Sequence, residues 1–228
     1  MDCDLKQLDK VKIAGWQKLS LIDYPGKMAA VIFLAGCNMR CHYCHNRQIL
    51  NAKQNKISFK AVWLDLSRRI KWLDAVVISG GEPTVYPELM QILSALRQLG
   101  LLIKLDTNGL RPDVVRRVVE MKLVDYIALD VKAPLEKYVL VTGVPINKMV
   151  ETLHYLQTQK QVPYMLRTTL SPRLDENDLK EMALNLIKGT DFWQIQQCRI
   201  EGAYSLDKIK DLVEILKMYV PYIVVKGV

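Results

Sequence analysis

The sequence predicts an α/β fold in which buried parallel strands alternate with amphipathic helices. Two observations predict it. Short apolar runs recur along the 228 residues, each ending in polar residues, and they lack the in/out alternation of a half-exposed antiparallel strand. Helical patterns lie between these runs at roughly the repeat of a βα unit. Since no low-complexity linker or change of composition divides the chain, we expect a single domain.

Seven largely apolar segments of four to eight residues are expected to form strands. They are Ala29–Ala35, Ala75–Ser79, Leu101–Asp106, Tyr126–Asp130, Val162–Thr169, Phe192–Gln196 and Tyr222–Val225. A membrane helix needs about 20 apolar residues, so we expect no membrane span. The charged segment Met1–Lys10 does not resemble a signal peptide. We therefore expect a cytoplasmic protein.

Six helices are expected between and after these strands. They are Ser58–Trp72, Pro87–Gly100, Pro112–Lys122, Ile146–Lys160, Glu176–Lys188 and Ser205–Met218. Ser58 can cap the first of them, because a serine hydroxyl accepts a hydrogen bond from a free N–H of the first turn. Pro87 and Pro112 suit a first turn, where a missing N–H costs nothing.

Polar residues follow five successive strands at the point where each ends. These segments are Ser79–Thr84, Asp106–Gly109, Asp130–Lys132, Arg167–Thr169 and the pair Gln194 and Gln196. In parallel α/β sheets and barrels, ligands bind at the carboxyl ends of the strands. We therefore expect these side chains to surround one site.

The chain carries a formal net charge of +8, with Lys and Arg spread along it rather than bunched. A basic protein can bind nucleic acid, but no motif of interleaved aromatic and basic residues accompanies the charge. We interpret the scattered charges as solvated helix faces and expect no nucleic-acid partner. An acidic protein partner would be served by the same charge.

Cysteines are the clearest chemical signal in the sequence. There are five, and an odd number without an export signal argues against a disulfide framework. Cys37, Cys41 and Cys44 fall within eight residues, which indicates a metal site. Three thiolates on a four-iron cluster would leave one iron open to another ligand. The alternative is zinc bound by these cysteines with His42 or His45, although no second pair of close ligands follows.

The spacing Cys37-x-x-x-Cys41-x-x-Cys44, with the aromatic Tyr43 before the last cysteine, resembles the signature of the radical S-adenosylmethionine (SAM) superfamily. Gly80-Gly81-Glu82-Pro83 resembles the GGEP motif of that superfamily. The resemblance implies a partial (β/α)6 barrel of parallel strands with outer helices, forming one domain over residues 1–228. Within it we expect an N-terminal extension (1–26), a barrel core (27–200) and a C-terminal helix and strand (201–228).

Further motifs resemble a subgroup of that superfamily, the glycyl-radical-enzyme activases. They are Cys44-His45-Asn46, Asp106-Thr107-Asn108-Gly109 and Asp130-Val131-Lys132. The segments Ser20–Lys27 and Phe33–Cys37 look closest to activating proteins of anaerobic ribonucleoside-triphosphate reductase. This resemblance implies that a [4Fe–4S] cluster reductively cleaves SAM, and that the resulting 5′-deoxyadenosyl radical makes a glycyl radical on a partner enzyme. It also implies a flavodoxin-like or ferredoxin-like electron donor.

The resemblance also implies roles for individual residues. Cys37, Cys41 and Cys44 would hold a single cluster, since no further cysteine-rich insert follows them. SAM would bind the fourth iron, and no catalytic residue is expected beyond cluster and SAM. Tyr43 is expected at the adenine of SAM, and Gly80, Gly81 and Glu82 at its methionine amine. Asp106 and Asn108 are expected at the amine, the ribose or a nearby cation. Lys132 with Asp130 is expected at the carboxylate, and the remaining expected contacts are Asn46 and Arg167.

Several alternatives stay open. Asp106 and Asn108 could simply form a turn with Gly109, and Arg167 could pair with a core carboxylate. Cys198 could be a buried thiol or lie near the site, and the roles of Gln194 and Gln196 are undetermined. For the function, the alternatives are activation of another glycyl radical enzyme such as pyruvate formate-lyase, radical SAM chemistry on a small molecule or nucleoside, and a non-enzymatic metal-binding module.

Overall fold

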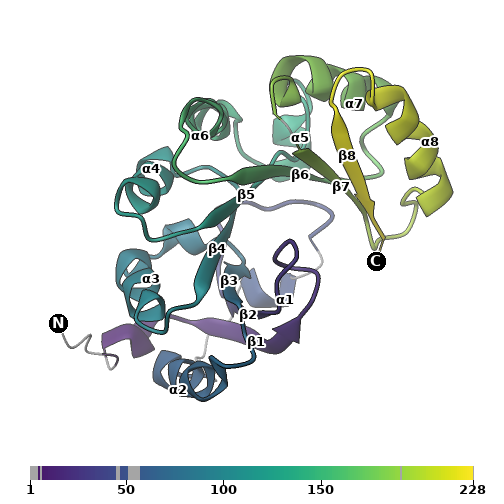
Figure 1. The fold of residues 1–228 in the computed structure, drawn as a ribbon. Coiled ribbons are helices and arrows are strands. Elements are labelled where there is room, and N and C mark those ends of the chain that lie inside the picture. Colours follow the sequence, from purple (N-terminus) through teal and green to yellow (C-terminus); the bar gives the residue numbers. More distant parts are fainter. Residues whose placement is uncertain (1–4, 6, 45–46, 51–56, 191, 228) are drawn as a thin grey trace.

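One sheet, with its strands in chain order, forms the centre of the computed structural model (Figure 1). The structure describes residues 5, 7–44, 47–50, 57–190 and 192–227. Within these ranges the sheet has eight strands: β1 (Ile13–Ser20), β2 (Ala29–Leu34), β3 (Ala75–Gly80), β4 (Leu102–Thr107), β5 (Tyr126–Asp130), β6 (Tyr164–Leu170), β7 (Phe192–Gln197) and β8 (Tyr222–Lys226). β1 is antiparallel to β2, and every later strand is parallel to the one before it.

All seven predicted strands are present, as β2 to β8. Strand β1 was not predicted and falls within the expected N-terminal extension. Two register shifts interrupt its pairing with β2, one between Ile13 and Gly15 and one between Gln17 and Ser20. A bulge breaks the two-residue period of a strand, so β1 shows neither a continuous apolar run nor a clean alternation.

The six predicted helices are also present, each somewhat shorter than expected. They are α2 (Phe59–Arg69), α3 (Leu89–Arg97), α4 (Pro112–Glu120), α6 (Asn147–Thr158), α7 (Glu176–Met182) and α8 (Leu206–Leu216). The Ser58 hydroxyl accepts a hydrogen bond from the Ala61 N–H at 3.1 Å, so the predicted cap is confirmed. Pro112 begins α4, but Pro87 lies before α3, whose N-cap is Glu88.

The π-helical η3 (Ala183–Ile187) continues α7 and falls within the predicted helix Glu176–Lys188. Four short helical segments were not predicted. They are η1 (Gln7–Lys10), α1 (Arg47–Leu50), η2 (Pro83–Val85) and α5 (Tyr138–Thr142). None is longer than five residues, and a hydrophobic period of 3.6 residues cannot be recognised over so short a stretch. Two of them, α1 and α5, flank the functional site described below.

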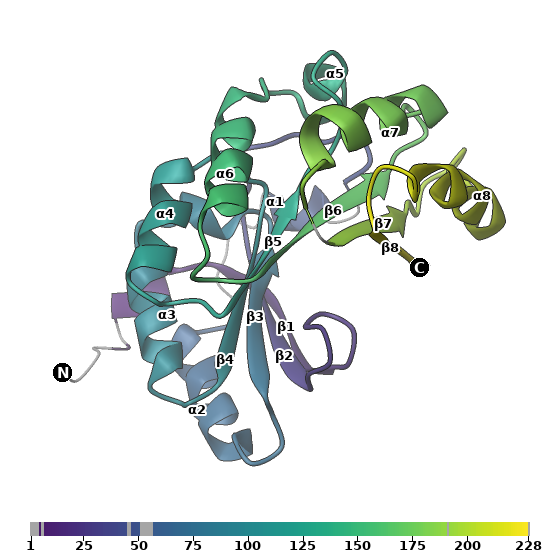
Figure 2. The ribbon, with the colours of Figure 1, turned by 45° about the horizontal axis from the view of Figure 1, so that its top comes forward.

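The sheet is curved and open, with the helices on its convex face (Figure 2). This confirms the expected α/β barrel-like architecture of parallel strands and outer helices. Residues such as Ile32, Ile78 and Leu105 are fully buried between strands and helices, whereas Tyr24, Val31 and Val77 belong to a smaller apolar cluster. Among the described helices, none combines the length and apolar character that crossing a membrane requires.

Candidate active site

The cysteine loop leaves β2 at the carboxyl edge of the parallel strands and forms one wall of a cavity of about 160 Å³. Strand ends and loops from five segments line this cavity. The lining residues are Cys37, Met39, Cys41, Tyr43, Cys44, Leu50, Gly80, Gly81, Asn108, Asp130 and Lys132. Nine of these were predicted as site residues, whereas Met39 and Leu50 were not. The three cysteines therefore share one cavity with the ends of β3, β4 and β5.

Two glycines at the end of β3 allow the cysteine loop to approach this closely. A Cβ on Gly81 would lie 1.7 Å from the carbonyl oxygen of Gly36, and one on Gly80 would lie 2.3 Å from that of Leu34. Gly80 also has φ +119°, where side chains are strained. The Gly81 N–H donates to the Leu34 carbonyl at 2.8 Å. Any side chain here would push away the residues that lead into Cys37.

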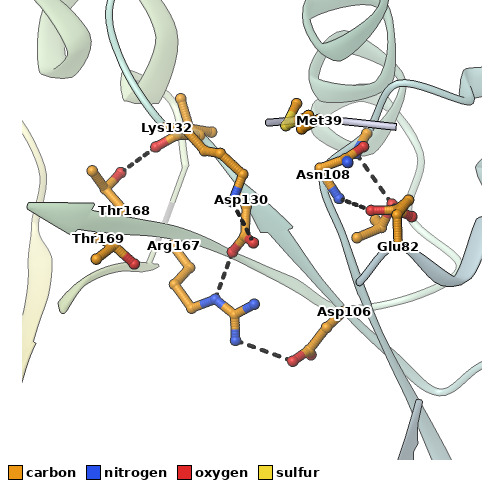
Figure 3. Close-up of polar contacts among 12 residues, drawn as sticks. Met39, Glu82, Asp106, Asn108, Asp130, Lys132, Arg167, Thr168 and Thr169 are labelled. Carbon is orange, nitrogen blue, oxygen red and sulfur yellow. Dashed lines mark hydrogen bonds and ion pairs between the residues drawn. The ribbon is translucent and has the colours of Figure 1, made fainter. Parts of the chain in front are cut away.

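Glu82 joins the ends of β3 and β4 beneath the cavity and does not line it. Its carboxylate is 1% exposed and accepts hydrogen bonds from the Asn108 N–H at 2.6 Å and the Thr107 hydroxyl at 2.7 Å (Figure 3). It also accepts from the hydroxyl and N–H of Thr84. Burial raises the pKa of Glu82, and these donors oppose that rise. Glu82 is thus placed to hold the Thr107–Asn108 turn rather than to contact a ligand in the cavity.

Asn108 forms the predicted turn and also lines the cavity. Its Oδ1 accepts from the Leu110 N–H at 3.1 Å, as expected for a turn. Its Nδ2 donates to Asn38 Oδ1 at 2.8 Å and lies 3.8 Å from Cys37 Sγ. The amide therefore connects the end of β4 to the cysteine loop while lining the cavity. Asn38 was missed in the sequence, although it directly follows the first cysteine of the motif.

A chain of ion pairs runs from β4 across β5 to β6 behind the cavity (Figure 3). Arg167 Nε donates to Asp130 Oδ1 at 2.6 Å, and its Nη1 donates to Asp106 Oδ2 at 3.1 Å. Asp106 is paired further with Lys104, and Asp130 with Lys132 at 3.0 Å. The three cations and two carboxylates of this series of ion pairs sum to a net charge of +1.

Arg167 and Asp106 belong to this chain and not to the cavity lining. The alternative that Arg167 pairs with a core carboxylate is what the structure shows, and it pairs with two of them. Asp106 also accepts from the Ser79 hydroxyl at 3.1 Å. The cavity itself receives the far end of the chain, where Asp130 and Lys132 lie.

Each charged group in this series of ion pairs stabilises the ionised form of its neighbour. Burial alone would raise the pKa of Asp130, but Arg167 and Lys132 hold it well below its ordinary value. Burial would likewise lower the pKa of Lys132, yet Asp130 holds it well above its ordinary range. Lys132 is therefore a permanent cation at the cavity wall, and the net positive charge favours an anionic group such as a carboxylate.

Two buried phenols stand beside the cysteines. The hydroxyl groups of Tyr43 and Tyr138 have no hydrogen-bond partner in the part of the chain that the structure describes, and Tyr43 lines the cavity. Buried polar groups without a partner are rare in proteins and mark places where another molecule can supply one. Burial raises the pKa of the Cys37 and Cys41 thiols, a cost that metal binding would offset because a metal binds the thiolate.

Both ring nitrogens of His42 face other groups. Nε2 lies 2.8 Å from the Ser171 hydroxyl, and Nδ1 lies 3.4 Å from the Val141 carbonyl. Across the described residues, no three His, Cys, Asp or Glu side chains converge as ligands of a single ion. With both ring nitrogens beside protein groups, His42 does not take the zinc-ligand position of the alternative. His45 and the predicted contact Asn46 lie outside the described residues.

The remaining candidates lie away from the cavity lining. Cys198 is 3% exposed and packs in the main core, as the buried-thiol alternative requires. The Thr169 hydroxyl donates to Gln196 Oε1 at 3.4 Å. Gln194 is paired in register with Arg167 and Val224, so it lies on the inner strand face with the ion-pair chain.

The site combines a loop of three cysteines, the glycines Gly80 and Gly81 and the cationic Lys132 around one cavity. It can be compared with known proteins. The family model of the radical SAM superfamily matches residues 31–186, which cover most of β2, the cysteine loop and β3 to β6. The chain belongs to the radical SAM superfamily. Members of this superfamily are enzymes that use a [4Fe–4S] cluster and SAM, and the present chain is therefore a radical SAM enzyme.

Related sequences extend beyond the matched region. A Methanocaldococcus jannaschii protein described as a "Putative glycyl-radical enzyme activating enzyme" is 33% identical over 236 residues, covering 96% of this radical SAM chain and 97% of the relative. A pyruvate formate-lyase-activating enzyme of Streptococcus mutans is 25% identical over 191 residues, covering 76% and 72% of the two chains.

Solved structures resemble the fold of this radical SAM enzyme. Streptococcus suis SuiB bound to SAM superposes with a TM-score of 0.67 at 16% identity, covering 84% of this chain. The match spans only 48% of SuiB, so about half of that longer neighbour lies outside it. Archaeal TYW1 superposes with a TM-score of 0.61 at 19% identity, covering 84% of this chain and 72% of its own. At such identities the likeness concerns the fold alone.

Proposed function

We propose that this radical SAM enzyme activates a partner enzyme by generating a glycyl radical on it. The observation that carries the proposal is the relationship to the M. jannaschii protein, which extends over almost the full length of both chains. Similarity to the S. mutans activating enzyme adds support, because that relative also covers most of the chain. Membership of an enzyme superfamily argues against a non-enzymatic metal-binding module.

The residues around the cavity suit the two cofactors. Three cysteine ligands for a four-iron cluster leave one iron for the amino and carboxylate groups of SAM. When bound together, cluster and SAM supply a one-electron cleavage that releases a 5′-deoxyadenosyl radical. The radical chemistry belongs to these groups, and the protein contributes binding, orientation and exclusion of water.

Each cavity residue then has a proposed task. Lys132, kept cationic by Asp130, neutralises the SAM carboxylate. Gly80 and Gly81 leave room for the methionine portion, and Tyr43 lines the cavity with a buried hydroxyl that has no partner among the described residues. Asn108 orients the cysteine loop through Asn38. Glu82, Asp106 and Arg167 act one step further away, by fixing the strand ends that carry the contacts.

The partner we favour is anaerobic ribonucleoside-triphosphate reductase, on the motif Ser20–Lys27 and the segment Phe33–Cys37. The similarity to a pyruvate formate-lyase-activating enzyme supports the second candidate, activation of that enzyme or another of its class. We place the protein in the cytoplasm, where thiols stay reduced, and treat residues 1–228 as one radical SAM domain.

An experiment with both partners tests this function. The reconstituted enzyme, SAM and dithionite are incubated anaerobically with each candidate reductase or lyase, and electron paramagnetic resonance is recorded. We expect a glycyl radical on the reductase and none on a reductase whose radical glycine is replaced by alanine. A radical on the lyase alone would assign the second candidate. If both partners stay diamagnetic while SAM is still cleaved, both partner assignments are wrong.

A further inference from the structure

Tyr138 begins the short helix α5, and its side chain is buried in the main core. The side chain is 0% exposed, as are those of Val141 and Thr142, which follow it by three and four residues. Residues at this spacing share one face of a helix. Val139 and Leu140 lie on the other face and are both 57% exposed. In Figures 1 and 2, α5 stands beside α7. The helix therefore holds a large phenol inside the protein.

The end of α5 is joined to the cysteine loop. The Arg40 N–H donates to the Thr142 carbonyl at 2.9 Å, and the His42 N–H donates to the Val141 carbonyl at 3.3 Å. Arg40 and His42 flank Cys41 in the sequence. Two backbone hydrogen bonds thus fix Cys41, on both sides, against the last turn of the helix.

The hydroxyl of Tyr138 has no hydrogen-bond partner among the described residues. Burial raises the pKa of Tyr138, Lys132 opposes this rise, and Tyr43, Cys41 and Asp130 add to it. Those four residues all line the cavity, whereas Tyr138 does not. The hydroxyl therefore lies outside the lining but within electrostatic range of Cys41, and it stays protonated, as a hydrogen-bond donor, at neutral pH.

The other groups in range of this hydroxyl leave one acceptor that the cofactor would create. Each carboxylate oxygen of Asp130 already accepts a hydrogen bond, one from Arg167 and one from Lys132. The hydroxyl of Tyr43 is itself without a partner in the described ranges, so the two phenols do not bond to each other. The sulfur of Cys41 becomes a strong acceptor once it is an iron-bound thiolate, because an ionised acceptor strengthens a hydrogen bond.

The first cysteine of the loop already has donors of this kind. The Met39 N–H donates to Cys37 Sγ at 3.4 Å, and Asn108 Nδ2 lies 3.8 Å from the same sulfur. Hydrogen bonds to the sulfurs are among the features that set the reduction potential of an iron–sulfur cluster. They favour the reduced form, because it carries the more negative charge.

We propose that the Tyr138 hydroxyl donates a hydrogen bond to the Cys41 thiolate of the bound cluster and so raises the reduction potential of the cluster. This rests on the proposed cluster site at the three cysteines. Tyr138 is then a positioning residue, which acts through Cys41 and contacts neither SAM nor the partner enzyme. The bond makes the cluster easier to reduce and leaves it a slightly weaker reductant toward SAM. No proton leaves the phenol.

Tyr138→Phe tests the proposal, because it removes the hydroxyl and keeps the ring. Its matched control is Tyr155→Phe. The Tyr155 hydroxyl is also buried without a partner in the described part of the chain, but it belongs to α6, where Arg116 lies 4.5 Å from the ring centroid, and not to the cavity lining. For the wild type and both variants, the measurements are urea unfolding of the metal-free chain, iron content after anaerobic reconstitution, calorimetric titration with SAM, and a redox titration of the cluster followed by electron paramagnetic resonance.

We expect metal-free Tyr138→Phe to be as stable as the wild type or slightly more stable, since the hydroxyl makes no bond in the described protein. It should take up the same amount of iron. Its equilibrium constant for cluster reduction should fall about three- to tenfold, and tenfold corresponds to about 59 mV for a one-electron couple. Electron–nuclear double resonance of the reduced cluster should show the loss of one proton coupling that exchanges in D2O. Tyr155→Phe should match the wild type throughout.

The other outcomes separate this bond from the cluster site. An unchanged potential in Tyr138→Phe with full iron content would overturn the bond and leave the cluster site intact. An unchanged potential with weaker SAM binding would assign the hydroxyl to SAM instead. A large loss of stability in the metal-free variant would reveal a structural partner, which also overturns the proposal. A wild-type chain that takes up no iron would refute the cluster site, and this bond with it.

Discussion

The guanidinium of Arg167 bridges the carboxylates of Asp130 and Asp106, at 2.6 and 3.1 Å, and so connects the ends of three neighbouring strands. Asp130 in turn pairs with Lys132 at the cavity wall. A side chain from β6 that does not line the cavity therefore determines the charge and orientation of one that does. This relationship explains why polar residues follow so many strand ends although only some of them contact the cavity.

Removing the bridge should destabilise the protein and weaken SAM binding. In Arg167→Ala the two carboxylates lose their shared partner and repel each other, and breaking a buried ion pair typically costs about 3–5 kcal/mol. We expect a lower free energy of unfolding in urea and a higher dissociation constant for SAM. Arg167→Lys should recover part of the stability but not the bidentate geometry. Unchanged SAM affinity in Arg167→Ala would contradict its positioning role.

The same ion pairs predict how stability depends on pH. The pKa values of Asp130 and Asp106 are lowered in the folded protein, so their ionised forms stabilise it above the ordinary aspartate pKa of about 3.9. That contribution is lost as the pH falls below this value. We expect the free energy of unfolding of the cluster-free chain, measured in urea, to drop between about pH 5 and pH 2. Asp130→Asn should be less stable at pH 7 and show a smaller drop, whereas an equal drop would count against this assignment.

The close packing of Gly81 against Gly36 gives a prediction about folding. Gly81→Ala adds a Cβ that would lie 1.7 Å from the Gly36 carbonyl oxygen, so backbone must move. Forcing extra atoms into a packed site costs about 1–3 kcal/mol or more. We expect a lower melting temperature and poor iron incorporation during reconstitution. Gly15→Ala is the control, because its Cβ would meet only Phe33 at an ordinary 3.8 Å, and it should incorporate iron normally. Normal iron content in Gly81→Ala would refute this role of the glycine.

The buried hydroxyl of Tyr43 predicts a variant that keeps its stability but binds SAM less tightly. Tyr43→Phe removes a hydroxyl that makes no hydrogen bond within the described protein, so the free energy of unfolding should stay the same or rise slightly. If SAM supplies the partner, its affinity should fall by about 2- to 10-fold, which corresponds to one hydrogen bond. Calorimetric titration with SAM measures it. A stability loss of several kcal/mol with unchanged affinity would show that the hydroxyl has a structural partner.

Sequence reasoning located the site because strand ends and cysteine spacing are local features. It recovered β2 to β8 and nine residues of the cavity wall. It did not reveal Lys104, which lies within an apolar strand and pairs with Asp106, two residues later in the same strand. It also expected Asp106, Glu82 and Arg167 at the ligand, since spacing identifies the end of a strand but not the partners that occupy a side chain. α5 was missed because a five-residue helix has no detectable period.

In the proposed site, Cys37, Cys41 and Cys44 hold the cluster, while Lys132 and Asp130 hold SAM for reductive cleavage. The most direct measurement is anaerobic: the cluster is reconstituted, dithionite and SAM are added, and 5′-deoxyadenosine is quantified. The wild type should form the product, and Cys37→Ala, Cys41→Ala and Cys44→Ala should form none, while Cys198→Ala retains activity. A wild-type preparation with an intact reduced cluster and bound SAM that yields no 5′-deoxyadenosine would show that this site does not cleave SAM.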